Sequence, residues 1–200
     1  MTRLILASTS PTRQRLLANA GIDFDAVAPE VDEEAVIALA RREGGGLTPA
    51  DAAGILARLK AETVSAAHPD AIVIGSDQTL DLDGELLTKA SDMAALRHKL
   101  LRLRGRRHML HAAVACASAG ETIWDVSDSA ALTMRDFSPA FLGRYLAACG
   151  EDLLGSVGGY RLEGVGVQLF SAIEGSYFTI LGLPLLPLLG WLRTKRHLEE

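Results

Sequence analysis

The chain has 200 residues, of which 48% are hydrophobic and 22% charged, and its formal net charge is -5. This apolar fraction excludes a disordered chain, and the length fits one ordinary domain, or at most two small lobes that share a core. The negative net charge argues against a general nucleic-acid-binding protein, because such a protein repels polyanions on average. The two cysteines, Cys116 and Cys149, have neither zinc-ligand spacing nor a disulfide framework, so a reducing compartment is expected.

The apolar segments are too short for a signal peptide or a membrane span. The N-terminal run, 4–7, falls short of the ~7–15 residues of a signal-peptide core. The longest apolar stretch, 180–192, contains Pro184 and Pro187 and falls short of the ~20 residues that cross a bilayer. We therefore expect a cytoplasmic protein without a membrane partner.

Apolar periodicity predicts alternating strands and helices through the first half of the chain. Ser10 with Pro11, and Thr48 with Pro49, predict helix starts, because the hydroxyl accepts from a free backbone amide and proline lacks only an unneeded donor. The expected elements are a strand at 3–7, a helix from 11 to Gly21, a strand at 24–28, helices at 33–43 and 49–67, and a strand at 71–74 that ends abruptly in the corner 75–78.

The second half continues with a hairpin around Asp83 and Gly84, since an Asp-Gly pair tolerates positive φ. The expected elements that follow are a helix at 92–103, extended segments at 107–118 and 121–133, a helix from 139 to 148, a glycine-rich segment at 155–166 leading into 165–170, and a helix that begins at Pro184. This order predicts an α/β fold with a mixed sheet.

Three common catalytic signatures are absent from the sequence. It contains no G-x-x-x-x-G-K-[ST] phosphate loop, no G-x-G-x-x-G after a strand and no G-x-S-x-G nucleophile elbow. The histidines show no metal pairing, and His108 and His111, three apart on a strand, should face opposite sides of the sheet. We therefore expect neither a serine-hydrolase triad nor a zinc enzyme.

Polar side chains follow two of the expected strands. Ser8, Ser10 and Arg13 lie where a strand ends and a helix begins, which offers free N–H groups and a positive dipole end to an anion. Asp77, in the corner 75–78, stands where open α/β sheets bind ligands, and an aspartate there can hold Mg²⁺ or take a proton from water. In the simpler alternative, Ser10 only caps its helix, Arg13 is solvated and Asp77 is a turn residue.

The ordered combination of these pieces resembles the Maf family of nucleoside triphosphate pyrophosphatases. The resemblance covers nearly the whole chain. It is carried by 6–13 (LASTSPTR), 29–33 (PEVDE), 60–61 (KA), 74–78 (IGSDQ), 88–89 (TK), 162–164 (LEG) and 181–184 (LGLP).

The resemblance implies a single elongated α/β domain over residues 1–200, of the Maf and inosine-triphosphatase type, with helices flanking a mixed sheet and two lobes around a nucleotide cleft. It also implies a hydrolase that cleaves the α–β bond of nucleoside triphosphates, with Mg²⁺ or Mn²⁺ as the divalent cation. Members often form homodimers, which makes a second copy of the chain a candidate partner.

Carried over position by position, the resemblance makes Asp77 the catalytic base and, together with Glu33, a metal ligand. Substrate contacts are expected from Ser8, Ser10, Arg13, Lys60, Gln78, Lys89 and Glu163. Two positions depart from the family pattern. Thr12 stands where many members have a first arginine, and Ser176 precedes Tyr177 where an acid is common.

Glu163 is the expected selector of the base. A carboxylate accepts from the N1–H and amino donors of guanine, whereas a uracil or thymine edge is better served by an amide. In the family, branches that act on dTTP and UTP tend to have glutamine here, and those resembling the 7-methyl-GTP branch have glutamate. The expected substrate is thus 7-methyl-GTP or a broader set, with dTTP and UTP as the alternative; in the simplest interpretation, Glu163 faces solvent.

A non-enzymatic role is the main competing hypothesis. The family has been linked to septum formation and division arrest, which would make nucleotide binding a signal without turnover. A basic cluster, comprising Arg97, Lys99, Arg102, Arg104, Arg106 and Arg107, also suggests a nucleic-acid or partner surface. No aromatic residue is interleaved there for base stacking, so we expect a solvated helix face instead.

Overall fold

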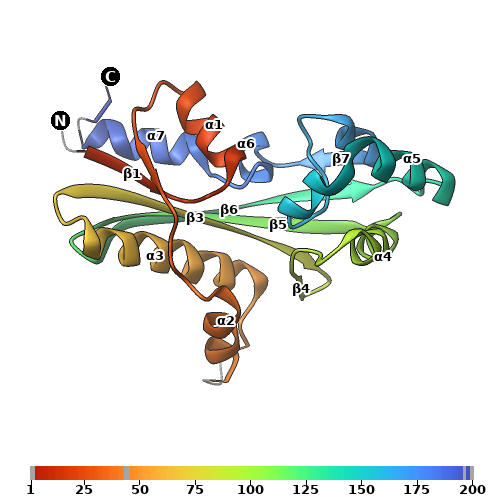
Figure 1. Cartoon of the computed structure of the whole chain (residues 1–200), viewed down its shortest axis with the longest axis horizontal. Coiled ribbons are helices and arrows are strands. Elements are labelled where there is room, and N and C mark those ends of the chain that lie inside the picture. Colours follow the sequence, from red (N-terminus) through yellow and green to blue (C-terminus); the bar gives the residue numbers. More distant parts are fainter. Residues whose placement is uncertain (1–2, 43–45, 196, 199–200) are drawn as a thin grey trace.

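The computed structural model describes residues 3–42, 46–195 and 197–198, which form one twisted sheet with helices on both faces (Figure 1). The elements are β1 (Arg3–Ala7), α1 (Pro11–Asn19), β2 (Asp25–Val27), α2 (Glu33–Arg42), α3 (Pro49–Ala67), β3 (Ala71–Leu82), β4 (Glu85–Leu87), α4 (Met93–Leu103), β5 (Arg107–Ser118), β6 (Glu121–Met134), α5 (Pro139–Cys149), η1 (Gly150–Gly155), η2 (Val165–Leu169), β7 (Phe170–Glu174), α6 (Tyr177–Ile180) and α7 (Leu185–Thr194).

The predicted mixed α/β sheet is confirmed. The described strands are ordered β2-β1-β3-β5-β6-β7, and β4 pairs with β3 beside this path. β1 runs parallel to β2 and β3, whereas the pairings of β3 with β4 and β5, of β5 with β6 and of β6 with β7 are antiparallel. The sheet therefore has a parallel part near the N-terminus and a longer antiparallel part.

Most of the predicted helix starts and turns are also confirmed. The side chains of Ser10, Thr48 and Ser138 each accept a hydrogen bond from a backbone amide of the helix that follows. Asp83 and Gly84 have φ angles of 54° and 85°, as a tight hairpin requires. The predicted end of the second helix, at residue 43, lies outside the described residues.

The predicted turn at 75–78 is wrong. β3 continues through these residues to Leu82, because it pairs with β5 without interruption from Val73 to Asp81. The glycine, serine and aspartate are typical of a turn, but pairing with a distant strand overrides this local preference. Asp77 therefore lies in the middle of a strand rather than at its end. Further along the chain, 165–169 forms the 3-10 helix η2, and β7 begins only at Phe170.

Helices cover the two faces of the sheet around β1, β3 and β5 (Figure 1). On one face α3 packs through alanines, in a cluster comprising Ala53, Ala57, Ala61, Ala113, Ala115 and Ala117. On the other face α1 and α7 bury larger side chains, among them Leu17, Leu188 and Trp191, against Leu6 and Ile74. None of the helices among the described residues is long and apolar enough to cross a membrane.

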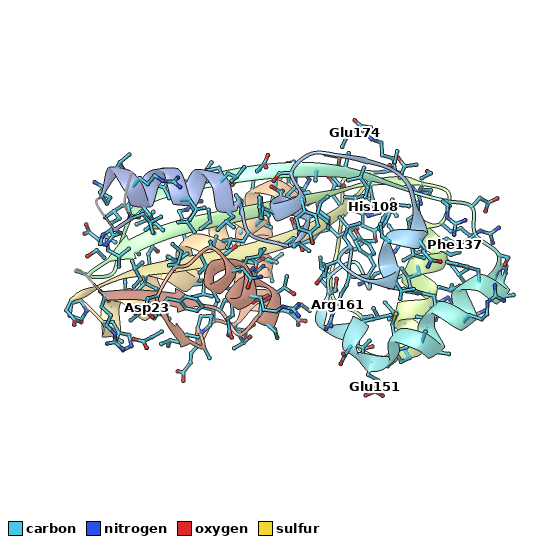
Figure 2. All side chains as sticks on the ribbon, turned by 90° about the horizontal axis from the view of Figure 1, so that it is seen from above. Asp23, His108, Phe137, Glu151, Arg161 and Glu174 are labelled. Atoms are coloured by element: carbon cyan, nitrogen blue, oxygen red, sulfur yellow. The ribbon has the colours of Figure 1, made fainter. Side chains whose placement is uncertain are left out.

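A second large core lies around the antiparallel end of the sheet. Here α4 and α5 pack against β3, β5 and β6 through side chains that include Leu96, Leu100, Leu132 and Leu142. Seen from above, Asp23 lies in one half of the molecule, and Phe137 and Glu151 lie in the other (Figure 2).

Gly75 sets the distance between α3 and the sheet. A Cβ atom at this position would lie 2.3 Å from the carbonyl oxygen of Ala57 and 2.6 Å from the amide nitrogen of Ala61. Both contacts are with helix backbone, which cannot rotate away as a side chain can. The close approach of α3 therefore depends on a glycine in β3 and on alanines in the helix.

We predict that Gly75→Ala lowers the free energy of unfolding by about 3 kcal/mol, because α3 must shift to admit the methyl group. Urea denaturation measures this change. Gly143→Ala is the matched control, since nothing lies within 4 Å of its added Cβ and alanine favours helix interiors. Equal stabilities for the wild type and Gly75→Ala would show that the contact is not tight.

Candidate active site

A gap along one side of β3 opens the cleft. The pairing of β1 with β3 ends at Ala7 and Gly75, and the pairing of β4 with β3 begins only at Leu80. A cavity of about 620 Å³ lies here. All nine site residues predicted from the sequence line it: Ser8, Ser10, Arg13, Glu33, Lys60, Asp77, Gln78, Lys89 and Glu163.

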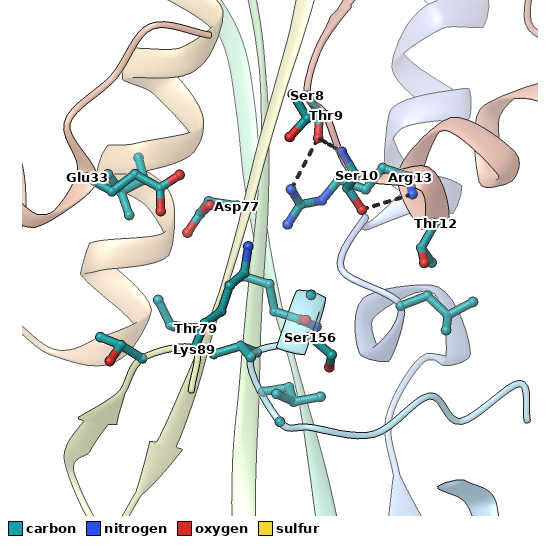
Figure 3. A pocket seen from close by; sticks show the side chains of 18 of the residues that line it. Ser8, Thr9, Ser10, Thr12, Arg13, Glu33, Asp77, Thr79, Lys89 and Ser156 are labelled. Atoms are coloured by element: carbon teal, nitrogen blue, oxygen red, sulfur yellow. Dashed lines mark hydrogen bonds between the residues drawn. The ribbon is translucent and has the colours of Figure 1, made fainter. Parts of the chain in front are cut away.

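Asp77 lies in the middle of this cleft (Figure 3). Glu33 is on one side of it and residues 8–13 are on the other, while Lys89 and Ser156 lie below it in this view. The groups come from segments far apart in the sequence: the end of β1, the start of α2, the middle of β3 and the loops after β4 and η1. Folding therefore collects carboxylates and cations in one place.

Lys60 is a buried ammonium group between two carboxylates. Its Nζ lies 2.5 Å from Oδ1 of Asp77 and 2.6 Å from Oε1 of Glu33. The side chains of Lys60 and Asp77 are only 7% and 10% exposed, whereas Glu33 is 49% exposed. Gly75 and Asp77 face the same side of β3, so the contact that brings α3 close at Gly75 also brings Lys60 to Asp77.

The first turn of α1 holds Arg13 at the cleft. Its Nε donates to the carbonyl oxygen of Gly182 at 2.8 Å, and its Nη1 lies 3.4 Å from Oγ of Ser8. Burial lowers the pKa of the guanidinium, and the nearby carboxylates of Asp77 and Glu33 oppose this shift, so the group stays charged. Arg13 is therefore packed against its neighbours rather than freely solvated.

Ser10 has the predicted capping role. Its Oγ accepts from the backbone amide of Arg13 at 3.4 Å, and its own amide donates to Oγ of Ser8 at 3.2 Å. Both serines line the cavity at the N-terminus of α1, where the helix dipole favours an anion.

Two side chains of β3 fasten the segment around α6 beside the cleft. The amide nitrogen of Gln78 donates to the carbonyl oxygens of Thr179 and Ile180 at 2.8 and 3.0 Å. Oγ of Ser76, fully buried, lies 2.9 Å from the carbonyl oxygen of Gly182. Because Gly182 also accepts from Arg13, this carbonyl links β3 to the first turn of α1. The sequence pattern 181–184 marked this segment but did not indicate its supporting role.

The far wall of the cleft carries Glu163. One of its carboxylate oxygens lies 3.5 Å from Nη2 of Arg15, and the side chain is 27% exposed. Arg15 lies three positions further along the helix than Thr12, so it does not simply replace the arginine that is missing there, and the structure places it against Glu163. This pairing was not predicted, because it joins two segments almost 150 residues apart.

Tyr160 is a second wall residue that the sequence did not reveal. It is buried, lines the cavity, and its hydroxyl lies 2.7 Å from Nε2 of His108. Burial lowers the pKa of His108 to about 4, so this histidine is neutral at pH 7, and burial also raises the pKa of the tyrosine. As predicted, His111 faces the opposite side of β5, where its Nδ1 lies 2.7 Å from Oγ of Ser129.

Carboxylates are the candidate metal ligands. Lys60 contacts one oxygen of Asp77 and one of Glu33, which leaves the second oxygen of each carboxylate for other partners. Mg²⁺ is often held by one or two protein carboxylates together with substrate phosphates, so this donor set fits it. Among the described residues, no group of three or more histidines, cysteines and acids lies together as a metal site.

Most of the basic cluster of α4 and β5 is paired with acids. Arg102 lies against Glu85, Arg104 against Asp136, Arg106 against Asp83 and Arg107 against Glu174. These pairs neutralise much of the charge that a phosphate backbone would require. The structure therefore gives no support to a nucleic-acid surface here.

The cleft brings arginine, lysine and carboxylate groups to the N-terminus of a helix. This combination is typical of sites for phosphorylated ligands. A family model described as Maf-like protein matches residues 3–195, and the chain belongs to the Maf family. The resemblance noted in the sequence is thus confirmed.

Similar proteins cover almost the entire chain. A protein of Granulibacter bethesdensis named nucleoside triphosphate pyrophosphatase is 51% identical, over 98% of this chain and 98% of its own. A Brucella abortus protein named 7-methyl-GTP pyrophosphatase is 48% identical, also over 98% of both chains. Among solved structures, a nucleoside-triphosphatase (dITP/XTP pyrophosphatase) of Mycobacterium abscessus aligns with 97% of this chain and 94% of its own, at 14% identity and a TM-score of 0.44, which is too low to add to the assignment.

We predict that Lys60→Met lowers the free energy of unfolding by about 3 kcal/mol, because it leaves the buried carboxylate of Asp77 without its cation. Glu33→Gln should cost less than about 1 kcal/mol, since that carboxylate is half exposed. Chemical denaturation of the two variants measures both changes. A larger effect for Glu33→Gln than for Lys60→Met would contradict this description of the site.

Proposed function

We propose that the chain is a nucleoside triphosphate pyrophosphatase that hydrolyses the α–β bond to a monophosphate and pyrophosphate. The observation that carries the proposal is the buried Lys60–Asp77 pair, which lies in a cleft that also contains Arg13 and the N-terminus of α1. The names of the similar proteins from Granulibacter bethesdensis and Brucella abortus support the same activity.

Neutralising charge is the first task of this site. A triphosphate carries about four negative charges, which repel a water molecule that attacks phosphorus. We propose that Arg13, Lys60 and Lys89 bind the phosphates, together with the hydroxyl and amide groups of Ser8 and Ser10. Fixed cations in a cleft stabilise the transition state more than the bound substrate, because negative charge moves onto the departing pyrophosphate.

Activating water is the second task, which we assign to Asp77. Lys60 holds one of its carboxylate oxygens, so the other is available to orient a water molecule or accept its proton. The side chain is one-tenth exposed and lines the cavity, so a water molecule can reach it. No covalent intermediate is needed, in keeping with a sequence that lacks a nucleophile elbow.

We propose that Asp77 and Glu33 also hold a divalent cation, Mg²⁺ or Mn²⁺: Glu33 through the oxygen that Lys60 does not contact, and Asp77 through a lone pair that it does not use for the water molecule. When bound, the ion supplies positive charge to the phosphate oxygens and helps to align the triphosphate. Gln78 has a supporting role in this proposal, because its amide fixes α6 beside Arg13.

Glu163 is the proposed selector of the base. It lines the cavity and is held by Arg15 rather than turned fully into solvent, which leaves carboxylate lone pairs for the N1–H and amino group of a guanine. We therefore favour 7-methyl-GTP, or a broader purine set, over dTTP and UTP. We further propose that the enzyme is cytoplasmic, that it forms a single domain with two lobes, and that two copies of it form a homodimer.

The proposal is tested by measuring pyrophosphate release from dTTP, UTP, CTP, GTP and 7-methyl-GTP, with Mg²⁺ or Mn²⁺ and with a chelator. We predict turnover that requires the cation and falls at least 100-fold in Asp77→Asn, because general base catalysis contributes about 10²–10⁴-fold. Asp70→Asn, an exposed residue outside the cleft, is the control. Nucleotide binding without any pyrophosphate release would favour the regulatory alternative.

Glu163→Gln should move the preference toward dTTP and UTP, because an amide offers both a donor and an acceptor to a pyrimidine edge. The ratio of kcat/KM for 7-methyl-GTP to that for UTP measures the change, which we expect to be roughly tenfold or more. Glu151→Gln, outside the cavity, should leave the ratio unaltered. An unchanged ratio in Glu163→Gln would remove this residue from base selection.

A further inference from the structure

Lys99 is a lysine whose ammonium group binds two carbonyl oxygens instead of an acid. It lies on α4, is half-buried, and its Nζ donates to the backbone carbonyl of Thr88 and, at 3.0 Å, to that of Val157. Among the described residues no carboxylate lies within ion-pair distance of it. Burial lowers the pKa of Lys99 to about 8, in keeping with an ammonium that has lost water without gaining an anion.

The two carbonyl groups belong to two separate segments that line the cleft, which we call its two walls. Thr88 immediately precedes Lys89, in the loop that follows β4, and both residues line the cavity. Val157 begins the segment that leads through Tyr160 to Glu163, which lines the cavity as well. Lys99 itself does not line the cavity, so it acts on the cleft only through these backbone groups.

The 157–163 segment also has contacts of its own with the core. The hydroxyl of Tyr145 donates to the carbonyl of Gly159 at 3.2 Å, and Tyr160 is bound to His108. These contacts fasten the 157–163 segment to the core around α5 and β5 but leave the loop of Lys89 untouched. Within the described part of the chain, Lys99 is the side chain that bonds to both walls.

We propose that Lys99 is a positioning residue that fixes the distance between the phosphate-binding Lys89 and the base-reading Glu163. This inference rests on the proposed function, because it assigns those two residues to opposite ends of one nucleotide. A lysine suits this role, because its single Nζ carries three N–H donors and can bind two carbonyl oxygens at once. Hydrogen bonds from a charged donor are also stronger than those between neutral groups. Without Lys99, each wall can still bind its part of the substrate, but the distance between Lys89 and Glu163 is no longer fixed.

The test is Lys99→Met, which keeps the length of the side chain and removes its donors. We expect KM for 7-methyl-GTP to rise roughly tenfold, a change typical of losing hydrogen bonds to a charged group, while kcat changes less. The preference for 7-methyl-GTP over UTP should fall as well. A purely structural role would lower the active fraction equally for both substrates and leave KM and their ratio unchanged.

Three further variants complete the experiment. Lys99→Arg should restore most of the substrate preference, because it keeps a charged donor, whereas Arg97→Met, on the exposed part of the same helix, should change nothing. Lys99→Gln, whose shorter amide has to give up at least one carbonyl, replaces Lys99→Met if that variant melts below the assay temperature, and we expect the same loss of preference. Wild-type values of KM and of the substrate ratio in the neutral variants would overturn the inference.

The same variants are compared by calorimetric binding of a GTP analogue with a methylene bridge between the α and β phosphorus atoms. If the wild type binds this analogue but turns over no nucleotide, the proposed activity fails, and the ratio of Kd values between Lys99→Met and wild type still decides the role of Lys99. If the wild type neither binds nor turns over nucleotide, both proposals fail.

Discussion

The contact between α3 and Gly75 is the constraint on which the site depends. Only a glycine in β3 admits the backbone of Ala57 and Ala61 at this distance, and only small helix residues allow the approach along the rest of the face. The contact places Lys60 opposite Asp77, two residues further along the strand. A packing requirement in the core is thus also what brings a buried cation to a buried carboxylate.

The topology of the sheet explains why the cleft lies where it does. β1 pairs with the first part of β3 in parallel, and β4 pairs with its last part in antiparallel orientation. Between them, this edge of β3 has no strand partner. Asp77 and Gln78 lie in this interval. A further strand beside them would close the space that the cavity occupies, so its absence leaves both residues at the cavity. The loop after β1, which starts α1, closes one side and supplies Ser8 and Arg13.

Much of this could be predicted from local sequence. The caps at Ser10 and Thr48, the tight turn at Asp83 and the mixed sheet follow from short-range patterns. The nine candidate site residues all line one cavity, but most of them came from the resemblance to a family and not from local patterns. The continuation of β3 through Asp77 could not be predicted, because pairing with the distant β5 overrides turn-forming residues. The Arg15–Glu163 pair and the two bonds of Lys99 also join distant segments, and no local pattern signals them.

We propose that Asp77 directs water to the α-phosphorus, and an isotope experiment shows whether this phosphorus is the one attacked. Turnover of a nucleoside triphosphate in ¹⁸O-labelled water, followed by mass spectrometry of both products, shows which phosphorus atom is attacked. We predict that the label appears in the nucleoside monophosphate and is absent from the pyrophosphate. Label in the pyrophosphate would place the attack on the β-phosphorus and contradict the proposed arrangement of substrate against Asp77, Arg13 and Lys60.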